Sequence, residues 1–135
     1  MEALQKAREF FARDRFATEG CGAVIESVGD GRAVCSMTVE PQHCNAYGNP
    51  MGGAIFTLAD FAFAVASNFQ QTPTVSITSQ ISFLSVAKGA HLTATATPIK
   101  RGRSTCFYQV DVVDDTGVHV AAVTFTGFVM NAPKQ

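Results

Sequence analysis

Length, composition and charge set the first limits on this protein. The chain has 135 residues, of which 47% are hydrophobic and 16% are charged, so we expect one globular domain over residues 1–135. Ten basic and 11 acidic residues give a formal net charge of -1 without any block of like charge. This balance argues against a nucleic-acid partner, which would require a basic stripe.

The order of charged and apolar residues argues against export and against a membrane span. Charged residues precede any apolar run in the first positions, so no secretory signal peptide is expected. The longest apolar stretch, residues 51–67, is short for a span and carries Asp60 near its centre. The four cysteines form no C-x-x-C pair, and we expect reduced thiols in a cytoplasmic protein.

The first predicted elements are one helix and one hairpin. Apolar residues at helical spacing predict an amphipathic helix over residues 2–13, which would cover one edge of the fold. Two β-rich runs, residues 23–28 and 33–39, flank Gly29-Asp30-Gly31. Because glycine tolerates the positive φ of a tight turn, these runs predict a β-hairpin.

A long helix and four strands are predicted next. After an irregular segment, an Ala-rich run without proline predicts a helix of about four turns over residues 53–68. Period-two alternation then predicts strands over residues 74–86, 90–101, 103–114 and 117–129. The hairpin turns expected between them lie at Lys88-Gly89, Arg101-Gly102 and 114–117. This order predicts an α+β fold with an antiparallel sheet curled around the long helix.

The long helix carries one stripe of small and polar residues on an otherwise apolar surface. The stripe consists of Gly53, Thr57, Asp60, Ala64 and Ser67. A helix that is apolar nearly all round is buried, so the stripe is expected to be its open face. A carboxylate in such a position is costly to desolvate. Asp60 therefore has either a structural role, as an acceptor of hydrogen bonds, or a catalytic one.

Two glycines stand where this helix begins. The first N–H groups of a helix have no acceptor within it and lie at the positive end of its dipole, so they can bind a developing oxyanion. Glycine also lets a substrate approach the backbone closely. Gly52 and Gly53 alone would suit an ordinary turn. With a carboxylate two turns later on the same face, they favour catalysis.

The spacing of these groups predicts a site shared between two subunits. Gly52 and Asp60 are eight residues apart. That separation is about 12 Å along a helix axis, so one helix cannot present both groups to a single carbonyl. Two antiparallel copies could do so, which predicts an isologous dimer.

Residues 45–68, NAYGNPMGGAIFTLADFAFAVASN, resemble the signature of hotdog-fold thioesterases of the PaaI type, in the acyl-CoA thioesterase superfamily. The similarity continues through VSITSQISFLSVAKGAHLTATA toward the C-terminus. The resemblance implies a hotdog fold that hydrolyses aryl, small or medium-chain acyl-CoA thioesters. It also implies no metal or cofactor beyond the coenzyme A of the substrate, and a homotetramer built as a dimer of dimers.

The resemblance further implies roles for individual residues. Asp60 would be the general base or nucleophile, and Ser76 would orient the water beside it. Gly52 would donate its N–H to the thioester oxygen, and Asn45 would polarise the same carbonyl. Met51 stands where most of the family has histidine, so any role of that imidazole is absent here.

Further substrate contacts are expected around these residues. Gly53 and Met51 adjoin the oxyanion donor, and Tyr47 in the preceding loop is a candidate for the wall of an acyl pocket. Arg101 and Arg103 flank a predicted turn and could meet the phosphates of coenzyme A, although solvated turn charges are commoner. The three histidines lack metal-ligand spacing, so no metal site is predicted.

Two other functions stay open at the level of sequence. A noncatalytic acyl-CoA-binding or sensor module would use the same groove, although it would need a partner. A hotdog dehydratase acting on 3-hydroxyacyl thioesters would need a histidine base, and His43 is the only histidine near the predicted site.

Overall fold

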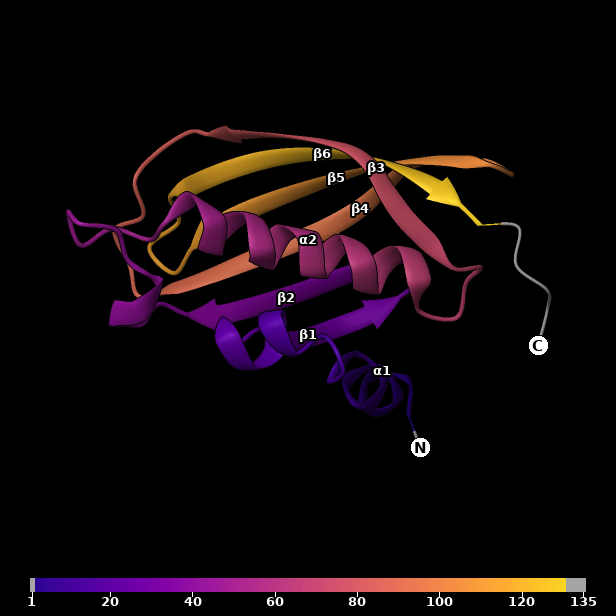
Figure 1. Cartoon of the computed structure of the whole chain (residues 1–135), viewed down its shortest axis with the longest axis horizontal. Helices are drawn as coiled ribbons and strands as arrows, with labels where there is room; N and C mark the ends of the chain where they lie inside the picture. The colour runs from indigo at the N-terminus through magenta and orange to yellow at the C-terminus, as the bar shows by residue number, and fades with distance from the viewer. Residues whose placement is uncertain (1, 131–135) are drawn as a thin grey trace.

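One long helix lies across the face of a six-stranded antiparallel sheet in the computed structural model, which describes residues 2–130 (Figure 1). The strands are β1 (Val24–Gly29), β2 (Arg32–Thr38), β3 (Thr74–Phe83), β4 (His91–Arg101), β5 (Thr105–Asp114) and β6 (His119–Val129). Their order in the sheet is β1-β2-β4-β5-β6-β3. This is the hotdog arrangement expected from the sequence.

The long helix, α2 (Gly52–Asn68), is held by apolar packing against the sheet. It contacts all six strands, and Leu58 on its inner side has no exposed surface. The ring of Phe63 stacks on Phe125 of β6 with centroids 4.5 Å apart. Burying such a side chain contributes about 1.5–3 kcal/mol. The predicted burial of this helix is confirmed.

The N-terminal segment covers the β1 edge of the sheet. It contains α1 (Ala3–Phe11), shorter than the helix predicted over residues 2–13, and a π-helical turn, η1 (Phe16–Gly20), that the periodicity did not predict. α1 packs against β1 (Figure 1). Its Phe11 ring meets Phe61 of α2 edge-on at 6.3 Å. The segment therefore links the sheet edge to one flank of α2.

The predicted hairpin between β1 and β2 is confirmed. Gly29 pairs with Arg32, which leaves a two-residue loop. Both loop residues have positive φ, 54° at Asp30 and 74° at Gly31. This is the conformation of a type I′ turn, whose twist matches that of the flanking strands.

The predicted hairpin at Lys88-Gly89 is wrong. β3 ends at Phe83 rather than at residue 86 and pairs with β6 at the far edge of the sheet, whereas β4 pairs with β2 and β5. The backbone of Gly89 is outside the positive-φ region that a tight turn would need. Residues 84–90 therefore form a crossing connection. The two later hairpins, β4–β5 and β5–β6, are present as predicted.

The described helices include none that is both long enough and apolar enough to cross a membrane.

Candidate active site

The start of α2, the loop before it and the β3–β4 connection meet at one end of the sheet (Figure 1). Together they enclose a cavity of about 380 Å³. Its lining comes from the loop (Asn45, Asn49, Pro50), from α2 (Gly52, Ile55) and from residues 83–87. The loop and helix start singled out in the sequence thus share a cavity with a segment that the sequence did not assign to the site.

The first backbone donors of α2 have no acceptor within the helix, and the first of them belongs to a residue that lines this cavity. The first hydrogen bonds of the helix run from Ala54 N and Ile55 N to the carbonyl of Met51, at 3.0 and 3.1 Å. The N–H groups of Gly52 and Gly53 precede them, at the positive end of a 17-residue helix. Gly52 lines the cavity, so a ligand there can accept its N–H.

Gly52 cannot be replaced by a larger residue without movement of the cavity wall. A Cβ built on Gly52 would lie 3.0 Å from Cζ of Phe83, tighter than ordinary van der Waals contact. A Cβ on Gly53 would meet nothing within 4 Å. The close approach of the Phe83 ring therefore explains the glycine at position 52.

Asn45 organises the loop that faces Gly52. Its Oδ1 accepts the N–H groups of Tyr47 and Asn49 at 2.9 and 3.1 Å, and its own N–H donates to the carbonyl of Asn49 at 2.8 Å. Because both loop bonds use Oδ1, the Nδ2 group is the end of the amide that can donate to a ligand. The sequence-predicted pair Asn45 and Gly52 is thus brought to one cavity.

His43 ties this loop to the N-terminal segment. Its Nδ1 accepts the N–H of Glu40 at 3.0 Å, so Nε2 carries the proton and donates to the carbonyl of Gly20 at 3.0 Å. Its backbone carbonyl accepts the N–H of Met51 at 2.8 Å. The imidazole is buried and both nitrogens are engaged, so His43 is a structural residue.

Asp60 lies half-buried on the open stripe of α2. Burial raises the pKa of its carboxyl group above the ordinary range, and the negative charge of Asp14 raises it further. The predicted stripe is wrong at Ser67, which is fully buried and donates its hydroxyl to the carbonyl of Phe63 at 2.7 Å. Arg101 of β4 also reaches this end of α2, where it donates to the carbonyl of Ser67, so the open stripe stops short of Ser67.

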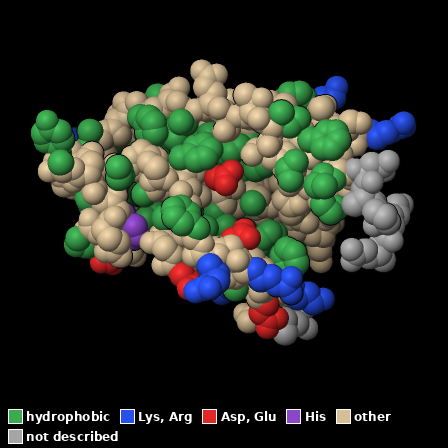
Figure 2. Space-filling model, in the orientation of Figure 1, with side chains coloured by type: hydrophobic (Ala, Val, Ile, Leu, Met, Phe, Trp, Pro, Cys, Tyr) green, Lys and Arg blue, Asp and Glu red, His purple; other side chains and the backbone are tan. Residues whose placement is uncertain are grey.

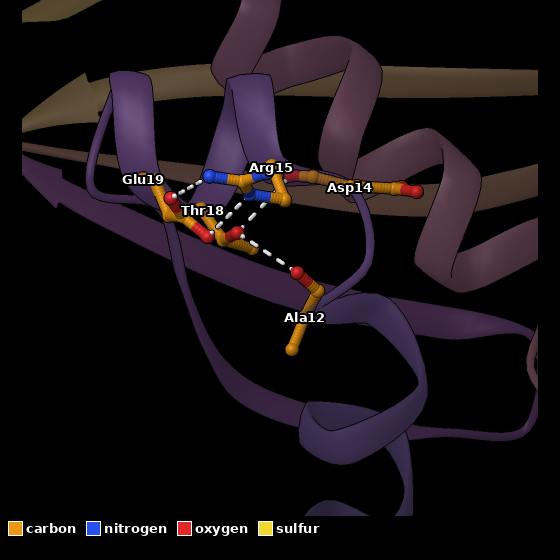
Figure 3. Close-up of polar contacts among 5 residues, drawn as sticks. All are labelled: Ala12, Asp14, Arg15, Thr18 and Glu19. Carbon is orange, nitrogen blue, oxygen red and sulfur yellow. Dashed lines mark hydrogen bonds and ion pairs between the residues drawn. The ribbon is translucent and has the colours of Figure 1, made fainter.

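Asp14 is a neighbour of Asp60 that sequence reasoning missed. It lies in the turn between α1 and η1, and its side chain extends away from the ion pair of Arg15 and Glu19 (Figure 3). The backbone carbonyl of Asp14 accepts from Thr18 Oγ1 at 3.1 Å, which holds the turn. Burial raises the pKa of the Asp14 carboxyl group. No local pattern marks this residue, because only the packing of η1 beside α2 brings the two carboxylates together.

Ser76 lies on the face of the sheet that carries α2. It pairs with Gly127 of β6, and paired residues point to the same face of a sheet. A Cβ on Gly127 would lie 3.2 Å from Cζ of Phe63, which shows that this face meets α2. Ser76 is itself exposed, because β3 is at the sheet edge.

The remaining predicted contacts are spread over the surface. Tyr47 is 91% exposed and Met51 is 55% exposed, and neither lines the cavity beside Gly52. Arg103 is exposed in the β4–β5 turn. Over α2, acidic side chains lie among apolar and uncharged ones, while lysine and arginine gather at the margins of this face (Figure 2).

Arg101 has a structural position at the C-terminal end of α2. Its guanidinium donates to the carbonyl groups of Ser67 and Thr72, both at 3.1 Å, and to Thr74 Oγ1 at 2.9 Å. A cation there complements the negative end of the helix dipole. These bonds hold Arg101 to the helix end, opposite the end that begins with Gly52.

Within residues 2–130, no three His, Cys, Asp or Glu side chains are grouped as metal ligands would be.

Comparison with known proteins identifies relatives of this chain. The model of the thioesterase superfamily matches residues 47–121. The acyl-coenzyme A thioesterase PaaI of Escherichia coli is 36% identical over 121 residues, which are 89% of this chain and 86% of that protein. Human acyl-coenzyme A thioesterase 13 is 32% identical over 117 residues, 84% of this chain and 79% of that protein.

Solved structures give the same result. The PaaI protein from the phenylacetic acid degradation operon of E. coli superposes with a TM-score of 0.88 at 29% identity, covering 96% of this chain and 95% of that one. A Streptococcus pneumoniae thioesterase solved with coenzyme A superposes with a TM-score of 0.83 at 29% identity, covering 92% and 99%. The resemblance to PaaI-type thioesterases is confirmed.

Replacing Asp14 should change the titration of Asp60. In Asp14→Asn the pKa of Asp60 should fall, because a negative charge that favours the protonated carboxyl has been removed. The pKa should stay above the ordinary value of about 3.9, since burial, the larger cause, remains. Carbon-detected NMR titration of the aspartate carboxyl groups measures this.

Glu19→Gln is the matched control for this titration. It removes a carboxylate from the same segment, but Glu19 is already paired with Arg15 at 2.8 Å. The pKa of Asp60 should be unchanged in this variant. Equal shifts in both variants would refute a specific coupling between Asp14 and Asp60.

Proposed function

The chain belongs to the thioesterase superfamily and is a thioester hydrolase, and we propose that its substrates are acyl-CoA thioesters with small, aryl or medium-chain acyl groups. The observation that carries this proposal is the half-buried Asp60 on the same helix as the acceptor-free N–H of Gly52. The relative solved with coenzyme A supports the choice of a CoA ester.

The cavity at the start of α2 is the proposed site of the thioester carbonyl. The N–H of Gly52 donates to its oxygen, and Asn45, which lines the same cavity, offers its Nδ2 group as a second donor. Negative charge develops on this oxygen when the carbonyl carbon becomes tetrahedral. Donors and a helix dipole fixed in advance stabilise that charge without reorganisation.

Asp60 is the proposed base or nucleophile. As a base it takes a proton from water while the water oxygen attacks the carbonyl carbon. The C–S bond then breaks, and the proton passes to the thiolate of coenzyme A. As a nucleophile it attacks the carbon itself, the C–S bond breaks and coenzyme A leaves as its thiolate. Water then hydrolyses the resulting anhydride, which releases the acid and regenerates the Asp60 carboxylate, while the remaining proton of the water passes to the thiolate. Both roles need an ionised carboxylate, and partial burial makes that carboxylate more basic.

We propose that each site combines Gly52 of one subunit with Asp60 of its twofold mate. β3 is at the sheet edge and carries exposed apolar residues, among them Val75 and Ile77. A free edge of ten residues is a template for pairing with a second chain. Antiparallel pairing of two β3 strands would set two α2 helices side by side in opposite directions, and Ser76 would then lie between them.

The rest of the proposal concerns assembly and cofactors. A dimer of such dimers would complete the homotetramer implied by the resemblance. The residues assigned above supply the donors and the base, so we propose hydrolysis with no metal and no cofactor beyond the coenzyme A of the substrate. Met51, exposed at the helix start, would pack against substrate instead of donating a hydrogen bond as a histidine can.

Two arguments favour this proposal over the alternatives. A dehydratase would need a free histidine, whereas both ring nitrogens of His43 are engaged. A noncatalytic module would bind acyl-CoA without needing a costly carboxylate on α2. Binding without hydrolysis across a broad acyl-CoA panel would favour that module.

Asp60→Asn should abolish most of the activity and preserve the fold. Loss of a general base lowers kcat by about 10²–10⁴-fold, measured by thiol release from acyl-CoA. Because the folded state raises the pKa of Asp60, ionisation of this residue lowers the free energy of unfolding. Stability therefore falls as pH rises through the titration of Asp60. The variant should therefore melt no lower than the wild type at neutral pH.

The control for this measurement is Asp111→Asn. Asp111 is a partly exposed carboxylate on β5 that pairs with His119 at 2.9 Å. Its replacement should leave kcat unchanged. A wild-type rate in Asp60→Asn would remove this residue from the mechanism.

Gly52→Pro tests the oxyanion donor, with Gly52→Ala as its matched variant. Proline removes the N–H, and the backbone suits it because Met51 has φ -69° and ψ 143° at the position before the first helical residue. Both variants add a Cβ near Phe83, but only alanine keeps the donor. Gly52→Pro should therefore have a kcat about 10²–10³-fold below that of Gly52→Ala. Equal rates would show that this N–H does not bind the oxyanion.

Mixed dimers test whether the site is shared between subunits. Asp60→Asn and Gly52→Pro chains should each be inactive alone. After co-refolding, about a quarter of the wild-type activity should return, because half of the random dimers are mixed and each holds one intact site of two. If each site were contained within one subunit, the mixed dimers would regain no activity.

A further inference from the structure

The β3–β4 connection crosses the ends of two strands before it reaches β4. Because β6 and β5 lie between β3 and β4 in the sheet, residues 84–90 must pass over the β5–β6 turn. At its start, the N–H of Leu84 donates to the carbonyl of Val120 at 2.8 Å. At its end, the carbonyl of Ala90 accepts the N–H of Val39 at 2.8 Å.

The middle of this connection is held by one buried carboxylate. Asp114, the last residue of β5, is 5% exposed. Its Oδ2 accepts the N–H groups of Lys88 and Gly89 at 2.7 and 2.9 Å. Its Oδ1 faces the turn and accepts Thr116 N and Oγ1 and Val118 N at 2.8 to 2.9 Å. Burial would raise the pKa of this carboxyl, but these donors outweigh burial and hold the pKa below its usual range.

Gly89 fits against the same turn from the other side. A Cβ at this position would overlap the carboxylate of Asp115. The glycine therefore allows the connection to lie close enough for the two N–H groups to reach Asp114. The close packing and the carboxylate bonds fix the same stretch of backbone.

The stretch fixed in this way carries one wall of the cavity at Gly52. Leu84, Ser85, Val86 and Ala87 all line that cavity, and they lie between the anchor at Val120 and the anchor at Asp114. A displacement of this wall would change the shape of the cavity that the substrate enters, and with it the substrate's affinity.

We propose that Asp114 is a positioning residue for the substrate, because its carboxylate holds residues 84–87 as the wall that faces Gly52. This inference rests on the function proposed above for the Gly52 cavity. Asp114 does not itself line the cavity. It acts through the backbone of Lys88 and Gly89, so its replacement should weaken substrate binding more than the chemical step at Asp60.

Asp114→Asn is the sharpest test because it preserves shape and removes one acceptor. The single amide oxygen can serve the three donors of the turn, and the NH₂ group then faces the N–H groups of Lys88 and Gly89, which it cannot accept. KM for acyl-CoA, measured by thiol release, should rise roughly tenfold, and so should Kd for coenzyme A, measured by calorimetry. kcat should stay within about twofold, and hydrogen exchange at Lys88 and Gly89 should accelerate.

Two further variants separate positioning from loss of stability. Asp115→Asn removes the same charge from the neighbouring residue, and Thr116→Val removes a donor on the turn side only. KM should be unchanged in both, even where the melting temperature falls. If Asp114→Asn does not fold, Gly89→Ala is the second variant: its Cβ would overlap the Asp115 carboxylate, and where hydrogen exchange at Lys88 and Gly89 shows that the connection has moved, KM alone should rise.

The outcomes distinguish this inference from the proposed function. An active wild type whose KM and Kd are unaltered by Asp114→Asn overturns the role of Asp114 and leaves the hydrolase assignment intact. A wild type that binds coenzyme A but hydrolyses no acyl-CoA overturns the substrate assignment, while weaker binding in Asp114→Asn still supports the wall. A fall in kcat at constant KM contradicts positioning.

Discussion

The central constraint is that α2 must be buried on nearly every side while its start and one stripe stay accessible. Apolar packing against all six strands meets the first requirement. The second leaves Gly52 at a cavity and Asp60 in a half-buried position. A carboxylate is tolerated there because it is only partly desolvated, and the same environment makes it a stronger base. Burial of the helix and the raised pKa of its carboxylate thus have one cause.

The elements predicted correctly are those that local sequence determines. The apolar circumference of α2 needs no distant partner to be recognised, and the two-residue loop at Asp30-Gly31 defines its own hairpin. The prediction of a turn at Lys88-Gly89 is wrong because a short connection that contains glycine is compatible with either a hairpin or a crossing. The choice depends on whether β3 pairs better with β4 or with β6, and that comparison involves residues far apart in the chain.

The residues of the candidate site also fall into those that local sequence marks and those that only the fold brings together. Asp60, Gly52 and Asn45 stand out because each has an unusual residue type for its position on or before a helix. The N–H of Gly52 and the side chain of Asn45 do share a cavity. Asp14 and the wall formed by residues 84–87 carry no such mark, since they join the site only through tertiary packing. Arg101 is the reverse case. Its position near a turn made it a candidate for substrate binding, but its guanidinium is hydrogen-bonded to the C-terminal end of α2.

The placement of β3 has a consequence for how the chain acquires its structure. Within residues 2–130 its one neighbour in the sheet is β6, the last described strand in sequence, with β4 and β5 between them along the chain. Closing so long a loop carries an entropic cost that local hairpins avoid, so the β3–β6 ladder should form late on the folding pathway. During synthesis β3 leaves the ribosome well before β6 does, and its apolar residues then depend on chaperones or transient collapse for protection.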